Sequence, residues 1–194
     1  MIMKILILIA VVAVVAVLLN AGCAAVRAGY ESAPYHVVRT AGKFELRDYP
    51  ALVVVEAPMQ GPNDSFMRLF RYIGGKNSTA EKIPMTTPVF MAGETTNATM
   101  EFVLPQKMGL DRAPAPAGAD LRLREIVAGR FAVLRFSGNR KAVNENKALA
   151  KLGTWLAEQK LKTTDGPVFG YFDPPWTPSF LRRNEVMLRL MSAP

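Results

Sequence analysis

The feature that most constrains this chain is that it passes twice through the same order of predicted elements. In each pass, two β-branched and aromatic runs precede a helical pattern of apolar residues, and two more strand-like runs follow it. Glu45 and Glu125 occupy corresponding places in the two passes, 80 residues apart. A repeat of two strands, a helix and two strands indicates an internal duplication.

The two passes together predict eight strands and two helices. The predicted strands cover residues 43–50, 51–59, 86–93, 98–105, 120–128, 130–138, 167–173 and 184–190. Antiparallel strands in this number, with only two helices, predict an α+β protein. We expect a distorted eight-stranded antiparallel β-barrel with two flanking helices and two pseudo-symmetric halves. The Pro-rich stretch 111–120 reads as an exposed connector between the halves.

The first predicted helix has recognisable ends. Asn63 or Asp64 is the expected N-cap, and the glycine pair 74–75 is expected to end the helix in a left-handed conformation. Its apolar face carries Phe66, Leu69, Phe70 and Ile73. In the second helix, the apolar face carries Ala148, Leu149, Leu152, Trp155 and Leu156.

The first 22 residues are predicted to be a signal peptide or a membrane anchor. One charge, Lys4, precedes an apolar run over 5–19, and small residues then surround the only cysteine, Cys23. The ending resembles a bacterial lipobox, although Asn20 stands where leucine is preferred, so we expect lipidation of Cys23. In the alternative, the apolar run continues as an uncleaved anchor of about 20 residues.

Both alternatives place the rest of the chain on the exported side of a bacterial membrane, in the periplasm or at the cell surface. Residues 23–35 then form a tether and residues 36–192 the folded domain. One cysteine allows no intrachain disulfide. The net charge of +8 favours attraction to an anionic leaflet, or it serves solubility alone. No basic block is interleaved with aromatics, so we expect no nucleic-acid partner.

Three stretches resemble the SOUL haem-binding protein family. They are "YIGGKN" (72–77) followed by "KIPMTTPV" (82–89), the early strand "FELRDYP" (44–50), and the closing segment "GYFDPPWTPSFLRRNEVMLRL" (170–190). The resemblance implies a distorted barrel of two related halves with two helices, and kinship with bacterial effector-binding domains that take bulky hydrophobic molecules. The glycine pair follows a helix instead of opening one, so the first stretch predicts a structural corner and no phosphate cradle.

By this resemblance, haem or a related tetrapyrrole binds in a groove along the first helix. Phe66, Met67, Leu69 and Phe70 would supply apolar contacts, and Arg71 would meet a propionate. The alternative is that these side chains only pack the helix on the sheet. Trp176, in "DPPWTP", is predicted either to line the ligand mouth or to belong to a rigid turn.

The expected haem site lacks a histidine ligand. Some family members carry histidine between the arginine and tyrosine of the early strand, where this chain has Asp48. The only histidine, His36, is expected to be a surface residue. Met67 or Tyr49 could approach the iron, but nothing singles either out, so no metal ligand is predicted.

Two other functions remain open, and catalysis is the less expected of them. The chain lacks the common hydrolase, zinc and P-loop motifs. A hydrolase for a small lipophilic substrate would need a buried glutamate with a raised pKa, from the set Glu56, Glu101, Glu125 and Glu185. The other alternative is a binding module for a different amphipathic molecule or a membrane partner.

Overall fold

The computed structural model describes residues 3, 5–7, 9, 11, 22, 29–59, 61–93, 97–118 and 120–191. Most of the predicted signal segment lies outside these residues, and so does Cys23. Among the described residues, none of the helices has the length and apolar character needed to span a bilayer.

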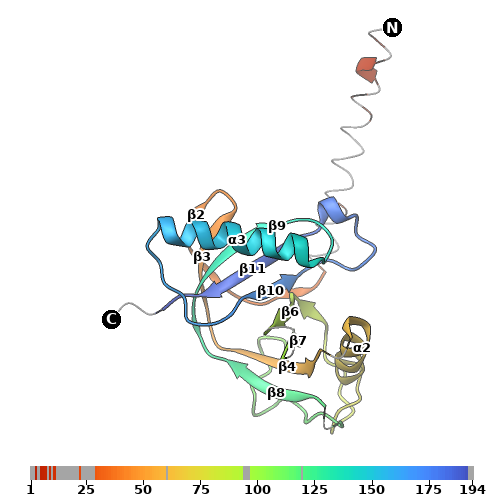
Figure 1. Ribbon diagram of the computed structural model, residues 1–194. Coiled ribbons are helices and arrows are strands. Elements are labelled where there is room, and N and C mark those ends of the chain that lie inside the picture. Colours follow the sequence, from red (N-terminus) through yellow and green to blue (C-terminus); the bar gives the residue numbers. More distant parts are fainter. Residues whose placement is uncertain are drawn as a thin grey trace.

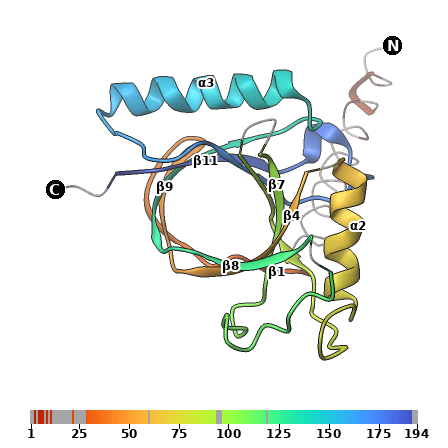
Figure 2. The same ribbon diagram turned by 60° about the horizontal axis from the view of Figure 1, so that its bottom comes forward.

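Nine strands form one antiparallel sheet in the order β2-β3-β9-β11-β10-β6-β7-β4-β8. The strands are β2 (His36–Ala41), β3 (Phe44–Tyr49), β4 (Leu52–Pro58), β6 (Val89–Ala92), β7 (Thr99–Val103), β8 (Arg122–Ile126), β9 (Gly129–Phe136), β10 (Val168–Tyr171) and β11 (Asn184–Arg189). A separate parallel pair joins β1 (Glu31–Ser32), inside the predicted tether, to β5 (Thr86–Thr87). Figure 2 shows the large sheet curling round into a ring.

The predicted α+β class and curled antiparallel sheet are confirmed, but the eight-stranded barrel is met only in part. All eight predicted strands are present, and β2 is added at one edge. The edge strands β2 and β8 are not neighbours in the described sheet, so it is a curled half-barrel.

The strand order has the symmetry that an internal duplication predicts. The first half contains β3, β4, α2, β6 and β7, and the second contains β8, β9, α3, β10 and β11. The counterparts are β3 and β8, β4 and β9, β6 and β10, and β7 and β11. Replacing each strand by its counterpart turns the order β3-β9-β11-β10 into β8-β4-β7-β6, which is the order of the same sheet read from its other end. The two predicted halves are therefore equivalent in topology.

Each half carries one α-helix on the outer side of the curled sheet, as Figure 2 shows. α2 (Pro62–Ile73) packs on β4 and β7, and α3 (Ala142–Glu158) packs on β9 and β11. A short 3-10 helix, η1 (Ser179–Leu181), precedes β11. The inner side holds an apolar cluster of its own, which includes Tyr49, Phe131 and Met187 and, among the residues that the structure describes, none from either helix.

The predicted N-cap of α2 is wrong. The helix begins at Pro62 with Gly61 as its cap, and no side chain caps the first turn. Proline at the first helical position needs no hydrogen-bonded N–H, which explains why the helix can start there. At the other end Gly74 has φ −76°, and the left-handed residue is Gly75 with φ +107°.

The glycine pair leads into a structural corner. The Asn77 side-chain amide donates to the carbonyl oxygens of Tyr72 and Glu81 at 3.0 and 2.7 Å, and its Oδ1 accepts from the Glu81 N–H at 3.1 Å. Further on, the Thr86 hydroxyl donates to the Val103 carbonyl at 2.5 Å. These bonds satisfy backbone groups within the corner, as expected of a motif that shapes the chain.

Candidate functional site

The outer face of α2 leaves large apolar side chains in solvent. Leu69 is fully buried against the sheet, and Phe66 packs edge-on against Phe102 with the ring centroids 5.2 Å apart. Phe66 also stacks on Phe70 at 6.0 Å. Phe70 is 47% exposed and Met67 is 43% exposed. Leu69 therefore belongs to the core, while Phe66, Met67 and Phe70 form an apolar strip at the surface.

The two arginines of α2 have different surroundings. Arg68 lies between Asp64 at 3.2 Å and Asp120 at 3.5 Å, and it donates to the Pro58 carbonyl at 2.8 Å. Arg71 is exposed and makes no side-chain hydrogen bond or ion pair with any residue that the structure describes. Arg71 is thus the cation of this helix that is free to meet an anionic group.

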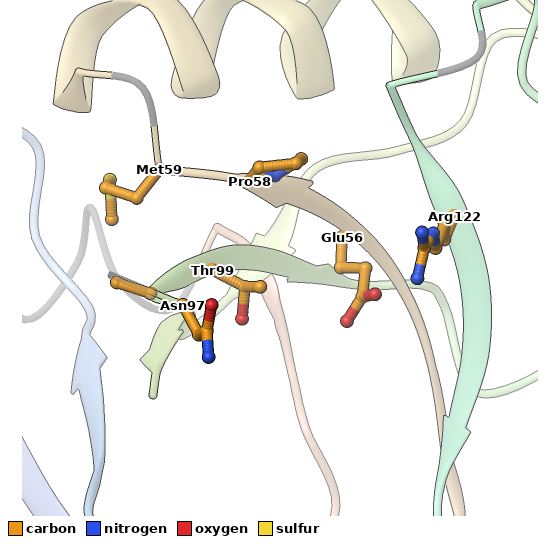
Figure 3. A pocket seen from close by; sticks show the side chains of 7 residues that line it. Glu56, Pro58, Met59, Asn97, Thr99 and Arg122 are labelled. Carbon is orange, nitrogen blue, oxygen red and sulfur yellow. The ribbon is translucent and has the colours of Figure 1, made fainter. Parts of the chain in front are cut away.

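A pocket of about 400 Å³ lies at the mouth of the curled sheet, below the N-terminal end of α2. It is lined by Glu56, Pro58, Met59, Asn97, Ala98, Thr99 and Arg122. Glu56 and Arg122 are directly opposite on β4 and β8, and Figure 3 shows their side chains next to each other. This volume lies within the usual range of small-molecule sites, and its lining mixes both charges with apolar groups.

Inside the curled sheet, an arginine and a carboxylate are buried together. The Arg47 guanidinium donates to the Glu185 carboxylate at 2.7 and 3.1 Å, and Arg183 donates to the same carboxylate at 2.6 Å. Burial alone would raise the pKa of Glu185, but hydrogen bonds and charge from Arg47 and Arg183 outweigh it and lower that pKa. Glu185 therefore stays ionised.

The other end of the sheet carries a similar pair. Arg124 on β8 donates to Glu101 on β7 at 2.5 Å and to Glu56 at 2.7 Å, and the Thr99 hydroxyl adds a bond to Glu101 at 3.1 Å. Under the exchange of halves, β8 and β7 correspond to β3 and β11, which carry Arg47 and Glu185. Each arginine–glutamate pair thus joins a strand of the first half to a strand of the second, and the carboxylate is buried in both pairs.

These pairs bear on the predicted catalytic glutamates. Glu185, Glu101 and Glu56 each accept a hydrogen bond from an arginine, and Glu125 is exposed. The pKa of Glu185 moves in the direction opposite to the one that a buried general base needs.

The remaining candidate residues come from other elements than α2. Trp176, 79% exposed, is in the loop between β10 and β11, which Figure 1 draws in blue. His36 is exposed and pairs with Asp48 across β2 and β3, whereas α2 packs on β4 and β7. Tyr49 is buried, and its hydroxyl accepts from Arg47 at 3.1 Å. Burial also raises the pKa of Tyr49 and keeps it protonated.

Sequence reasoning missed most of the pocket lining. Met59, Asn97, Thr99 and Arg122 come from the ends of strands that are neighbours only in the folded sheet. Period-2 alternation does place Thr99 and Glu101 on one face of β7, so their shared side was predictable, but their neighbours on β4 and β8 were not.

Comparisons with known proteins agree with this architecture. The family described as SOUL heme-binding protein matches residues 30–189. Heme-binding protein 1 of Xenopus tropicalis is 27% identical over 156 residues, which cover 74% of this chain and 81% of the relative. The crystal structure of the EcmrR C-terminal domain has a TM-score of 0.53 at 16% identity and covers 82% of this chain and 99% of that one. A hydrolase from Listeria innocua has a TM-score of 0.55 at 8% identity, covering 79% and 94%. At these identities the two structures show the fold alone.

Proposed function

This chain belongs to the SOUL heme-binding protein family, and from that premise we propose that it binds haem or a related tetrapyrrole on the exposed face of α2, without a histidine ligand. The observation that carries the proposal is the surface strip of Phe66, Met67 and Phe70 on a helix whose other side is fully packed. A contiguous apolar strip on a surface helix is typical of a binding site.

Arg71 is proposed to meet a propionate of the ligand. It lies one helical turn from Met67, on the same side of α2, and has no competing carboxylate partner in the described part of the chain. A guanidinium and a carboxylate form a strong, charge-assisted hydrogen bond. Arg68 is less suited to this role because two aspartates and a backbone carbonyl already surround it.

Apolar contact and charge would therefore hold the ligand. His36 belongs to the opposite end of the sheet, and Tyr49 is protonated inside the core. The Met67 thioether is the soft donor on the strip itself. We expect the protein to bind iron-free protoporphyrin about as tightly as haem, since its side chains add little at the iron.

A titration of the detergent-solubilised full chain with haem tests the proposal, using the shift of the Soret band. Phe70→Ala should weaken binding by about tenfold to a hundredfold, because burying a phenyl ring contributes about 1.5–3 kcal/mol. Arg71→Gln should weaken it by about threefold to tenfold. The matched controls on α3, Val143→Ala and Lys151→Gln, remove an exposed apolar group and an exposed cation and should leave affinity unchanged.

Equal effects of the α2 and α3 variants would overturn the α2 site. A haem affinity far above the protoporphyrin affinity, lost in Met67→Ala, would instead show that the iron is ligated by methionine.

The 400 Å³ pocket favours a second candidate, the binding of another amphipathic molecule between β4, β7 and β8. Such a ligand would contact Met59 and meet Glu56 or Arg122 with a polar group. Hydrolysis is less well supported, because Glu185 has a lowered pKa and is paired with two arginines.

We also propose that residues 1–22 act as a signal or anchor and that Cys23 is lipidated, which would place the domain on the exported side of a bacterial membrane. The apolar run over 5–19 and the small residues around Cys23 support this. Metabolic labelling with a fatty acid tests it: label should follow the native chain and be lost in Cys23→Ser, and label retained in that variant would contradict it.

A further inference from the structure

A second pocket, of about 180 Å³, lies at the opposite mouth of the curled sheet, where β9 and β11 meet the start of β3. It is lined by Lys43, Arg135, Phe136, Ser137, Leu181, Arg182 and Arg183. Every charged residue in this lining is a cation. We propose that this pocket binds an anionic phosphate group, either that of a lipid headgroup or that of a soluble phosphate.

Two of the four cations are already fixed by the fold. Arg183 donates to Glu185 at 2.6 Å and lies 4.0 Å from the centre of the Phe172 ring. Arg182 donates to the Thr177 carbonyl at 2.7 Å and to the Pro175 carbonyl. These bonds hold the chain that enters β11 in place, so one wall of the pocket is rigid before any ligand arrives.

The other two cations are unpaired. Lys43 and Arg135 lie side by side, since the Arg135 N–H donates to the Lys43 carbonyl at 3.1 Å. Neither side chain has an ion pair or a hydrogen bond to any residue that the structure describes. They are the groups available to bind an incoming anion, with the Ser137 hydroxyl beside them.

The local electrostatics favour such an anion. Burial and then the charge of Arg183 lower the pKa of Arg135, and the neighbouring Glu185 and Glu45 offset this only in part. A phosphate between Lys43 and Arg135 would relieve the repulsion among the cations. Arginine suits this role because its planar fork can donate two parallel hydrogen bonds to a phosphate.

The larger pocket provides the internal comparison. It occupies the equivalent mouth, because β4, β7 and β8 correspond to β9, β11 and β3. There Glu56 faces Arg122, so the carboxylate would repel an anion. The charge that favours phosphate is therefore confined to one of two related positions.

Exposed aromatic side chains beside the pocket favour lipid as the source of the phosphate. Trp176 is 79% exposed and Phe180 is 68% exposed, in the same loop whose end supplies Leu181, Arg182 and Arg183 to the lining. Exposed aromatic rings next to cations are typical of protein surfaces that lie at a bilayer interface. Arg183 also donates to the Tyr35 hydroxyl at 3.3 Å, so an early part of the chain, on the side of the proposed anchor, contacts this end of the sheet.

Calorimetric titration of the full chain with inorganic phosphate in a non-ionic detergent, at constant ionic strength, is the first test. The double variant Lys43→Gln with Arg135→Gln should bind phosphate at least about tenfold more weakly than the native chain. Arg122→Gln, in the equivalent pocket, should bind as the native chain does. A circular dichroism spectrum unchanged from native would show that the double variant is folded.

The second test separates the two sources of phosphate. The chain has two tryptophans, and Trp155 is buried between α3 and the sheet, so Trp155→Phe leaves Trp176 as the reporter. This reporter chain is reconstituted into phosphatidylcholine vesicles with or without phosphatidylglycerol. If phosphatidylglycerol shifts the Trp176 emission to the blue, and the double variant shows no such shift, the bound phosphate is that of a lipid headgroup. Phosphate binding without such a shift would identify a soluble phosphate.

The proposal is overturned if neither probe binds, or if the double variant binds both probes as well as the native chain. The haem titration tests the exposed face of α2, which does not line this pocket, so either proposal can fail without the other.

Discussion

The two ends of the sheet carry similar arginine–carboxylate pairs at different depths. The end with Arg47 and Glu185 is sealed from solvent, and the end with Arg124 and Glu101 is open to it. Arg47 and Glu185 are 2% and 1% exposed, whereas Arg124 is 39% exposed beside a Glu101 that is 1% exposed. Arg124 therefore sits where water and a ligand can reach it. The larger pocket lies at this open end.

The two helices follow the same division. α3 buries Ala148, Leu152, Trp155 and Leu156, and Trp155 stacks on Phe44 with the rings 5.0 Å apart. α2 buries Leu69 but leaves Phe70 and Met67 in solvent. A duplicated fold can thus keep one copy closed for stability and present the surface of the other copy for binding.

Arg47→Met should have the largest effect on stability. It would leave the Glu185 carboxylate buried with Arg183 as its one guanidinium partner, and breaking a buried pair typically costs about 3–5 kcal/mol. Urea unfolding followed by circular dichroism measures the loss. Arg47→Met combined with Glu185→Leu should recover most of it, and a double variant as unstable as the single one would contradict this account.

Arg124→Met should cost less, about 1–2 kcal/mol, because Arg124 is 39% exposed, so that water can enter the space its side chain leaves beside Glu101, and Thr99 still donates to Glu101. The same unfolding measurement applies. A loss equal to that of Arg47→Met would show that the two ends are equally sealed and would remove the distinction between them.

Lowering the pH should reduce the contribution of Glu185 to the free energy of unfolding by at most about 1.4 kcal/mol per pH unit, which is the limit for one proton. The pKa of Glu185 is lower in the folded chain than its ordinary value of 4.5, so the folded state binds this proton less readily than the unfolded state. The ionised Glu185 carboxylate contributes its full stabilisation above about pH 4.5, and this stabilisation is lost as the pH falls through the folded-state pKa. Unfolding curves between pH 7 and pH 3 should be flatter for Arg47→Met with Glu185→Leu than for the native chain. Identical pH slopes would contradict the assignment.

Much of the fold could be predicted from the sequence, because alternation and helical spacing act over short stretches. All eight predicted strands and both helices are present, and β3 and β8 do exchange with the halves. The predicted match of Glu45 with Glu125 is wrong, because Glu45 lies opposite Val133 on the inner face while Glu125 lies opposite Val53 on the outer face. β2 escaped prediction because all its residues are exposed and no buried face creates an alternating pattern.

The site was less predictable, because its partners are far apart in the chain. Arg47 and Glu185 are 138 residues apart, and only the folded sheet brings them together. The apolar spacing of α2 correctly suggested a packed helix, but it did not reveal that Leu69 faces inward while Phe70 and Met67 stay outside. That distinction depends on how the helix lies on β4 and β7.

The order of the strands has a consequence for how the molecule holds together. β3, from the first half, completes the sheet beside β9, and β8, from the second half, completes it beside β4. The first strand of each half therefore pairs with a strand of the other half. Severing the chain in the 111–120 connector would leave each half dependent on a strand covalently attached to the other, so neither is a self-sufficient folding unit. The duplication yielded a single interlocked body whose halves melt together.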